Sequence, residues 1–354
     1  MRALGRPGCW GAGALLAMGT MGAGLALAAL PTMQRAIVQV NQGGQAVLQL
    51  QSVPVLAPRQ GEVLVQVFAA AINPADWKSR DSGSGAAPLI PGFDVAGRVA
   101  AVGAGVSTLK VGEAVFGVTG RGDVGGLNGA YAQYVVIPAG DLVAKPHNVT
   151  YAQAAGLGVA TLAGVRIVDQ AHVRRGERVL ITGVAGGVGS AAAQAAIARG
   201  ALVIGTASAR HVAYLHRLGV SEVIDYTQGD WAQRARAAAP QIVLDTVGAD
   251  TARAAFALVA RGGTFVSVGT HDYTPERCAA SGVICPAGGS VVGGPVPTAV
   301  LLRETAELAG AGKLTVHVDR IYPLAQAAAA QAFNRAGHTE GKVVLAIGVV
   351  AGSR

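Results

Sequence analysis

The sequence predicts an α/β protein in which a β-rich domain precedes a doubly wound parallel sheet. Three observations support this prediction. Between about Met33 and Lys145, short valine-rich runs are separated by Gly, Pro, Asn and Asp, which is typical of strands and turns. From about Tyr151 onward, apolar runs alternate with helical patterns, as in a parallel sheet covered by helices. A glycine-rich turn within Val179–Gln194 joins one of these runs to a helix.

The composition limits the classes of protein that are possible. The chain has 354 residues, 51% of them hydrophobic and 14% charged, so two domains with a large core are expected. The formal net charge is +8, but the basic residues are scattered and do not alternate with aromatic residues, which argues against nucleic-acid binding. The histidines and cysteines show no metal-ligand spacing, and neither a G-x-S-x-G motif nor a pair of catalytic carboxylates indicates a hydrolase.

Residues 1–32 differ from the rest of the chain. They begin with Arg2 and Arg6, continue through about 20 uncharged apolar and small residues and end near an A-x-A pattern, as a secretory signal does. The same stretch is long enough for a membrane anchor. Alternatively, translation starts at Met33, because MQRAIVQV is itself a credible first strand. A signal or anchor implies an exported or membrane-anchored protein and a start at Met33 a cytoplasmic one, so the localisation stays open.

The first predicted domain comprises residues 33–150. Its strand-like runs read RAIVQV, AVLQLQSV, GEVLVQVFAAAI, GRVAAVG, EAVFGV and AYAQYVVIP. Many of these runs alternate apolar and polar residues or are rich in valine, which favours a β-rich domain.

The second predicted domain comprises residues 151–290. Its first strand is expected at Arg178–Thr182, followed by a helix over Gly189–Gly200 that ends in glycine. Three further strand-like runs follow, at 201–210, 241–248 and 263–269. The alternation of these strands with helices predicts a doubly wound parallel sheet.

The turn between the first strand and its helix has the composition of a phosphate-binding loop. Gly186, Gly187 and Gly189 carry no side chains, so a pyrophosphate can approach the backbone N–H groups at the helix N-terminus, where the helix dipole favours anions. Dinucleotide-binding folds use such a turn, although Val184 stands where their first glycine is usual. A tight turn without a ligand is the alternative.

The end of the next strand indicates which cofactor would bind. NAD-binding folds carry a carboxylate for the ribose hydroxyls about 20 residues past the glycines, and here that stretch contains none. Ser208 and Arg210 would suit a 2′-phosphate instead, so the sequence predicts NADP(H). An ordinary solvent-exposed arginine at a helix start is the alternative for Arg210.

The last segment, residues 291–354, does not continue the alternation. It holds a strand-like run, an alanine-rich helix from about Leu324 and a final strand KVVLAI, and it is expected to return to the first domain. Cys278 and Cys285 precede this segment, and the sequence is compatible both with a disulfide between them and with free thiols.

Seven motifs, taken in order, resemble the medium-chain dehydrogenase/reductase superfamily and, within it, the zinc-independent quinone oxidoreductase (zeta-crystallin-like) branch. They are AAAINPADWKSR, PLIPGFDVAGRVAAVGAGVSTLKVGEAVFG, GAYAQYVVIP, GERVLITGVAGGVGSAAAQ, LGVSEVIDY, VLDTVG and HTEGKVVL. The resemblance extends from about Met33 to Gly348. It implies a GroES-like β-barrel catalytic domain, a Rossmann domain, a cofactor in the cleft between them and a C-terminal segment that rejoins the first domain. Relatives commonly dimerise, so a homodimer is expected.

Three positions separate this chain from the zinc alcohol dehydrogenases that it resembles. Those enzymes carry a cysteine at the position of Asn73 and a His-Glu pair at Phe93 and Asp94. Asparagine and phenylalanine cannot replace thiolate and imidazole as zinc ligands. The resemblance therefore implies a metal-free enzyme that passes hydride from NADPH to a quinone or an α,β-unsaturated carbonyl.

The predicted catalytic residues are Asn73, Asp76 and Tyr131. Asn73 matches the cleft asparagine of the branch, which would bond near the nicotinamide ribose or the substrate oxygen, and Asp76 would orient neighbouring groups. Tyr131 or Tyr134 could donate a proton. The structural alternatives are a turn before proline for Asn73, a helix cap for Asp76 and packing for the tyrosines. Lys342 could approach the cleft, but a position on the surface is expected.

The predicted cofactor residues share a place on one edge of the parallel sheet or in the motifs beside it. They are Thr161, Gly186, Gly187, Val188, Gly189, Ser208, Arg210, Tyr226, Val247, Gly248, Val268 and Gly269. By resemblance, Thr161 lies near the cofactor phosphates or nicotinamide and Tyr226 lines the adenosine phosphate. A different class of function stays open, in which the fold binds NADPH as a sensor or as a crystallin-like structural protein without turnover.

Overall fold

The computed structural model describes residues 30–44, 47–82, 87–119, 126–270, 272–286 and 298–348. The predicted leader lies outside these residues except for its last three positions, and so does the predicted boundary between residues 290 and 291. Residues from Thr32 onward form one compact unit.

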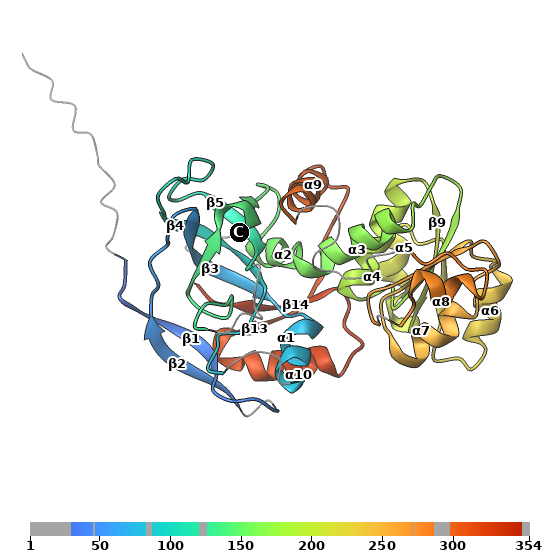
Figure 1. Ribbon diagram of the computed structural model, residues 1–354, viewed down its shortest axis with the longest axis horizontal. Helices are drawn as coiled ribbons and strands as arrows, with labels where there is room; N and C mark the ends of the chain where they lie inside the picture. The colour runs from blue at the N-terminus through green and yellow to red at the C-terminus, as the bar shows by residue number, and fades with distance from the viewer. Residues whose placement is uncertain are drawn as a thin grey trace, which may run out of the picture. The chain divides into compact units, whose positions relative to one another are not determined.

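An antiparallel sheet dominates the first half of the chain (Figure 1). Its strands from this half are β3 (Glu62–Ala71), β4 (Asp94–Val102), β5 (Ala114–Val118), β6 (Tyr134–Pro138) and β7 (Leu142–Ala144). A separate hairpin pairs β1 (Met33–Gln39) with β2 (Leu48–Pro54). The prediction of a β-rich first domain is confirmed.

The C-terminal segment completes this sheet. Strand β14 (Lys342–Ala346) pairs antiparallel with β3, and β13 (Val318–Pro323) pairs parallel with β14, giving the order β13-β14-β3-β4-β5-β7. Figure 1 shows both strands, at the red end of the colour scale, beside β3. Residues far apart in the sequence therefore share one sheet, because the apolar β14 is buried between β13 and β3.

The second half forms a parallel sheet of five described strands in the order β10-β9-β8-β11-β12. The strands are β8 (Arg178–Thr182), β9 (Leu202–Ala207), β10 (Glu222–Asp225), β11 (Ile242–Asp245) and β12 (Thr264–Ser267). Their buried valines, leucines and isoleucines reflect coverage of both faces. The order reverses between β8 and β11, and ligands of such sheets bind outside the carboxyl ends of the strands at this point.

Helices connect and cover both sheets. Those in the parallel region are α4 (Gly187–Ala198), α5 (Val212–Arg217), α6 (Trp231–Ala237), α7 (Ala249–Phe256) and α8 (Pro275–Ala279). The others are α1 (Pro74–Asp81), α2 (Tyr151–Gly156), α3 (Val159–Gln170), α9 (Thr298–Gly310) and α10 (Ala327–Arg335). Helix α2 packs on β3 and β4, whereas α3 packs on α4. The consecutive helices α2 and α3 therefore lie at the junction of the two sheets. None of the helices in the described ranges is long and apolar enough to span a membrane.

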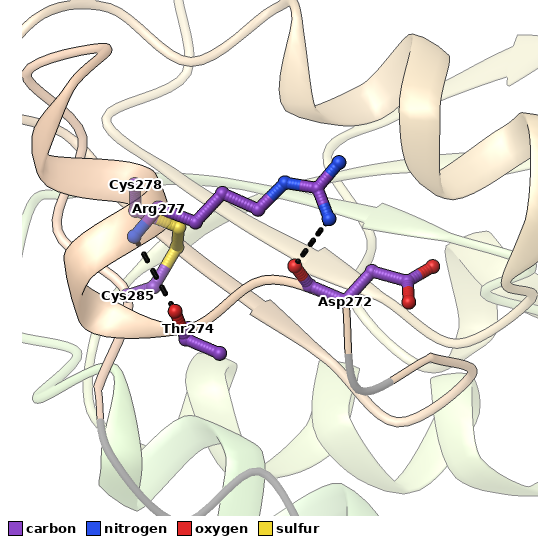
Figure 2. Close-up of a disulfide and its surroundings, with 5 residues drawn as sticks. All are labelled: Asp272, Thr274, Arg277, Cys278 and Cys285. Carbon is purple, nitrogen blue, oxygen red and sulfur yellow. Dashed lines mark hydrogen bonds between the residues drawn. A yellow bond between two sulfur atoms is a disulfide. The ribbon is translucent and has the colours of Figure 1, made fainter.

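The two cysteines in the parallel region form a disulfide, which decides between the alternatives that the sequence left open. Cys278 in α8 is bonded to Cys285, seven positions later (Figure 2). Both cysteines are buried. The bonded segment runs beside β12, where the Phe265 N–H donates to the Ile284 carbonyl at 2.9 Å. The disulfide therefore closes a short loop against the edge of the parallel sheet.

Candidate active site

The glycine-rich turn leads directly into α4. Helix α4 begins at Gly187 with Gly186 as its N-cap, two residues earlier than the sequence indicated. A Cβ on Gly189 would lie 2.4 Å from the Gly183 carbonyl oxygen, so the residue type is set by the close approach of helix and strand. The turn therefore exposes backbone N–H groups at a helix N-terminus, as anion binding requires.

The valine at the first glycine position has a structural compensation. The Val184 side chain is fully buried, and a Cβ on Gly205 of β9 would lie 2.3 Å from the Val184 Cγ1. The missing side chain at position 205 thus makes room for the side chain at position 184. The departure from the usual glycine pattern does not disturb the turn.

A buried carboxylate organises the carboxyl ends of the parallel strands. Asp245, the last residue of β11, accepts hydrogen bonds from the Thr182 and Ser267 hydroxyls, each at 2.7 Å. It also accepts from the Val247 N–H at 3.3 Å and the Gly248 N–H at 3.0 Å. Because these donors use the carboxylate oxygens, Asp245 holds the loop after β11 rather than a ligand.

The loops after β11 and β12 are in contact. A Cβ on Gly269 would lie 2.5 Å from the Gly248 backbone, and Gly248 has a φ of +89°. The structure thus brings together four predicted cofactor residues, namely Val247, Gly248, Val268 and Gly269.

A cavity of about 440 Å³ opens at this edge of the sheet. Among the predicted cofactor residues, Gly186, Ser208, Tyr226 and Val247 line it. Its remaining lining residues are Gly183, Ala185, Thr206, Ala207, His211, Trp231, Thr246, Thr251, Gly337, His338 and Thr339. None of these described lining residues carries a carboxylate. The volume lies within the range of small-molecule sites.

Of the residues predicted to lie at a 2′-phosphate, Ser208 and Tyr226 line this cavity, and Arg210 follows Ser208 by two positions. The Ser208 Oγ is buried and has no hydrogen-bond partner among the described residues. Arg210 is exposed and donates from Nη2 to the His338 carbonyl, while the Tyr226 hydroxyl lies 3.1 Å from the His338 Nδ1. A lone buried hydroxyl, a guanidinium and an imidazole thus lie close together at the end of β9.

The C-terminal segment supplies three lining residues that the sequence did not indicate, namely Gly337, His338 and Thr339, and the two residues after them attach this segment to the cavity wall. The Glu340 carboxylate lies 2.9 Å from the His211 Nδ1 and 3.4 Å from the His317 Nε2. The Gly341 N–H donates to the Ala185 carbonyl at 2.8 Å, which attaches this segment to the glycine-rich turn. The HTEGK motif was visible in the sequence, but nothing local to it indicated that its residues reach the cavity.

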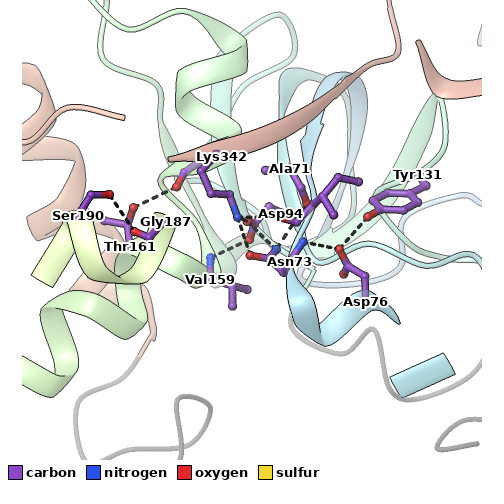
Figure 3. Close-up of polar contacts among 12 residues, drawn as sticks. Ala71, Asn73, Asp76, Asp94, Tyr131, Val159, Thr161, Gly187, Ser190 and Lys342 are labelled. Carbon is purple, nitrogen blue, oxygen red and sulfur yellow. Dashed lines mark hydrogen bonds and ion pairs between the residues drawn. The ribbon is translucent and has the colours of Figure 1, made fainter. Parts of the chain in front are cut away.

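A second polar cluster joins the antiparallel sheet to α3 (Figure 3). Asn73, the N-cap of α1, is 1% exposed. Its Oδ1 accepts from the Lys342 Nζ at 2.6 Å, and its Nδ2 donates to the Asp94 Oδ2 at 2.9 Å. The Lys342 ammonium also donates to the Ile72 carbonyl at 2.9 Å and lies 3.5 Å from the Asp94 Oδ2. These contacts hold the Asn73 amide in one orientation.

The expectation of a surface position for Lys342 is wrong. Lys342 is 4% exposed, because the pairing of β14 with β3 directs it inward, where Asp94 and two amide oxygens accept its charge. Asp94 is fully buried, and its Oδ1 accepts from the Val159 N–H at 2.7 Å, in the first turn of α3. Burial raises the pKa of the Asp94 carboxyl, and Lys342, Asn73 and the Val159 N–H oppose this rise.

Asp76 and Tyr131 continue the cluster on the other side of Asn73. The Asp76 Oδ2 accepts from the Asn73 N–H and from the Tyr131 hydroxyl, each at 2.7 Å. Burial raises the pKa of Asp76 from 3.8 to about 7, although both hydrogen bonds act in the opposite direction. Burial and the neighbouring Asp76 raise the pKa of Tyr131 well above its ordinary value. Asp76 caps α1 and at the same time has a carboxyl that titrates near neutral pH.

The predictions for Thr161 and Tyr134 fall on residues with structural partners. Thr161 is buried in α3 and donates to the Gly156 carbonyl at 3.0 Å. Tyr134 is partly buried at the start of β6, where its N–H donates to the Gln34 Oε1 at 2.7 Å. The cofactor role of Thr161 and the proton-donor role of Tyr134 stay predictions.

The side chains at the zinc-ligand positions do not fit a zinc ion. Asn73 already binds the Lys342 ammonium through its amide oxygen, and Phe93 has no donor atom. The ammonium lies 3.5 Å from Asp94, where its charge would repel a second cation. Across the described ranges, no group of three or more His, Cys, Asp or Glu side chains has the geometry of a metal site.

Comparison with known proteins relates this arrangement to a family. A profile described as "Alcohol dehydrogenase GroES-like domain" matches residues 59–147, and one described as "Zinc-binding dehydrogenase" matches residues 218–345. A solved quinone oxidoreductase from Pseudomonas syringae pv. Tomato DC3000 is 30% identical, with a TM-score of 0.77, covering 88% of this chain and 99% of that one. The protein belongs to the medium-chain dehydrogenase/reductase superfamily.

Further relatives are members of the same superfamily. An alcohol dehydrogenase superfamily protein from Novosphingobium aromaticivorans is 31% identical with a TM-score of 0.77, over 89% of this chain and all of that one. The Arabidopsis thaliana protein "NADPH-dependent alkenal/one oxidoreductase, chloroplastic" is 36% identical over 214 residues, 57% of this chain and 54% of that protein. The quinone oxidoreductase of Rattus norvegicus is 34% identical over 221 residues, 61% of this chain and 65% of that protein. The matches to these curated relatives thus span about half to two thirds of their length. The α/β prediction, with a GroES-like domain and a parallel-sheet domain, is confirmed for this superfamily member.

Proposed function

We propose that this medium-chain dehydrogenase/reductase is an NADPH-dependent oxidoreductase that transfers hydride to a quinone or an α,β-unsaturated carbonyl without a metal ion. The observation that carries the proposal is the cavity at the carboxyl ends of the parallel strands. It combines a glycine-rich helix N-terminus with a lining in which no described residue carries a carboxylate, and the buried Ser208 hydroxyl has no hydrogen-bond partner within the part of the chain that the structure describes.

Two features of the cavity favour NADPH over NADH. A carboxylate would accept the 2′- and 3′-hydroxyls of NADH but would repel a 2′-phosphate, and none of the described lining residues carries one. Ser208 and Arg210 would donate to the phosphate, and Tyr226 would lie beside it. Gly187, Val188 and Gly189 in the first turn of α4 would present backbone N–H groups to the pyrophosphate, and Gly186, whose N–H donates to the Gly183 carbonyl at 3.1 Å, would line the approach.

The acceptor class follows from the polar cluster and from the relatives' names. A site whose zinc-ligand positions hold an amide and a phenyl ring has no strong electrophile with which to ionise an alcohol. A quinone or a conjugated enone is already electron-poor and needs one hydride and one proton, which is the chemistry that NADPH and solvent protons supply. Relatives named quinone oxidoreductase and alkenal/one oxidoreductase support the same acceptors.

Asn73, Asp76 and Tyr131 are the proposed catalytic residues. They form one hydrogen-bonded chain, and Asp76, with a pKa of about 7, can hold or release a proton at neutral pH. Asn73 would align the acceptor side of the site. Thr161, Val247, Gly248, Val268 and Gly269 are proposed to surround the cofactor.

The test is NADPH oxidation by the purified full-length protein with a panel of quinones and enones in the presence of a metal chelator. We expect turnover with NADPH well above that with NADH, and the preferred acceptor defines the substrate class. Binding of NADPH without turnover of any acceptor would contradict an enzymatic role and favour a sensor or structural protein. Light scattering of the same sample tests the expected homodimer.

Two substitutions test the cofactor assignment. Ser208→Ala and Arg210→Ala should each lower kcat/KM for NADPH roughly 10- to 100-fold, because each removes a donor to a charged phosphate, and should leave kcat/KM for NADH nearly unchanged. Arg217→Ala, at an exposed arginine of α5, is the matched control. Equal losses with both cofactors would refute the 2′-phosphate assignment.

A further inference from the structure

Lys342 has a buried, charged side chain, and the proposed function assigns it no role. It begins β14, more than 260 positions from Asn73 in the sequence, yet its ammonium lies 2.6 Å from the Asn73 Oδ1. A lysine ammonium has three donor hydrogens, and Asn73, the Ile72 carbonyl and Asp94 lie around them. The charge is therefore fully partnered inside the protein.

The stem of Lys342 contacts the glycine-rich turn. A Cβ on Gly187, the first residue of α4, would lie 2.8 Å from the Lys342 Cδ, and a Cβ on Gly156 would lie 3.2 Å from its Cγ. The preceding residue, Gly341, donates its N–H to Ala185 in the same turn. One side chain thus extends from the proposed pyrophosphate turn to the proposed catalytic asparagine (Figure 3).

The ammonium determines which way the Asn73 amide points. With Lys342 donating to its oxygen, the amide nitrogen faces the Asp94 Oδ2 at 2.9 Å. A flipped amide would place its N–H₂ group against the ammonium and its oxygen against a carboxylate, and each contact would be repulsive. Removing the ammonium would leave Asp94 buried without its cation, and such a charge is costly.

We propose that Lys342 is a positioning residue, whose buried ammonium locks Asn73 and Asp94 in the arrangement that hydride transfer requires and ties that arrangement to the pyrophosphate turn. This inference rests on the proposed function for its kinetic consequence. Its effect on the carboxyl groups does not depend on turnover, because the Lys342 charge lowers the pKa values of Asp94 and Asp76 in the ligand-free protein.

Lys342→Met in the full-length protein is the first test. Methionine keeps most of the aliphatic contact with Gly187 and removes the charge, so NADPH should bind within about threefold of wild type. The single-turnover rate of hydride transfer should fall roughly 10- to 100-fold, because a displaced amide misaligns the reacting groups. Lys313→Met, at an exposed lysine, is the matched control and should leave both quantities unchanged.

Lys342→Ala supplies a second kinetic readout. The shortened side chain leaves a space beside Asn73 and Asp94 that a primary alkylamine can enter, so ethylamine or propylamine should restore part of the lost rate. A merely structural lysine would not give this rescue. Trimethylamine, which offers a single N–H, should restore less.

A carboxyl titration gives the readout that needs no acceptor. The groups that face Asp76 are Asp94, Lys342 and Tyr131, and Lys342 also faces Asp94. The positive charge of Lys342 lowers the pKa of both nearby carboxyls, Asp76 and Asp94. Lys342→Met should therefore raise these pKa values by more than about one pH unit, as measured by infrared difference spectroscopy. Asp76→Asn and Asp94→Asn assign the bands.

The outcomes separate the two proposals. If wild type reduces no quinone or enone, the proposed function fails, and the titration and NADPH binding then decide the role of Lys342. An unchanged carboxyl titration in Lys342→Met overturns the inference whatever the wild type reduces. A wild-type rate of hydride transfer in folded, NADPH-bound Lys342→Met overturns it as well.

Discussion

Replacing Asp76 by Asn should remove a pH dependence from the stability of this protein. Asparagine has the shape of the neutral acid and keeps an oxygen that accepts from the Asn73 N–H and the Tyr131 hydroxyl. It also places an N–H₂ group where the buried Asp76 Oδ1 has no hydrogen-bond partner among the residues that the structure describes. The substitution therefore mimics protonated Asp76 at every pH.

The magnitude follows from the pKa of the carboxyl, which burial raises from 3.8 to about 7. Because the folded protein holds the Asp76 proton more tightly than the unfolded chain does, the free energy of unfolding falls as pH rises between these two values and is level above the upper one. At about 1.4 kcal/mol per pH unit, this carboxyl lowers the stability by about 3 kcal/mol between about pH 5 and pH 9. Asp76→Asn should lose this fall and be the more stable protein at the alkaline end.

The assay is urea unfolding of wild type and Asp76→Asn across that pH range, with the difference in unfolding free energy plotted against pH. Asp250→Asn is the control, because the Asp250 side chain is 91% exposed in its pair with Arg253. The control should follow wild type within about 0.5 kcal/mol. Parallel curves for wild type and Asp76→Asn would refute the reasoning, since Asp76 would then not titrate between its two expected values.

Two further predictions concern packing and the disulfide. Gly205→Ala should cost about 1–3 kcal/mol in unfolding free energy, because the new Cβ would lie 2.3 Å from the Val184 Cγ1. Adding Val184→Ala should recover only part of this loss, because the Cβ that alanine keeps would still lie 2.8 Å from the new Cβ, whereas Val184→Gly removes that contact as well. Equal stability of Gly205→Ala and wild type would contradict the packing argument. The double variant Cys278→Ser with Cys285→Ser should lower the unfolding free energy by about 2–3 kcal/mol, because opening this short loop raises the conformational entropy of the unfolded chain. In the same urea titration, a reductant should destabilise wild type but not the double variant.

Much of the fold follows from local signals in the sequence. The apolar run at Arg178–Thr182 forms β8 with the expected bounds, and β9, β11 and β12 lie within the expected runs. The short strand β10 was not expected from the sequence. Alternating elements predicted the parallel sheet, because each element must bury one face against a neighbour. The final strand KVVLAI was expected to rejoin the first domain, and β14 pairs with β3.

The sequence by itself determined the glycine-rich turn, the absence of a carboxylate after β9 and the amide at position 73, because each depends on residue type and short-range spacing. Tertiary structure decided the environment of each group. It buried Lys342 against Asp94, raised the pKa of Asp76 and brought His338 beside Tyr226. Burial and the pairing of charges depend on which distant segments pack together, and strand pairing across nearly the whole chain sets that packing.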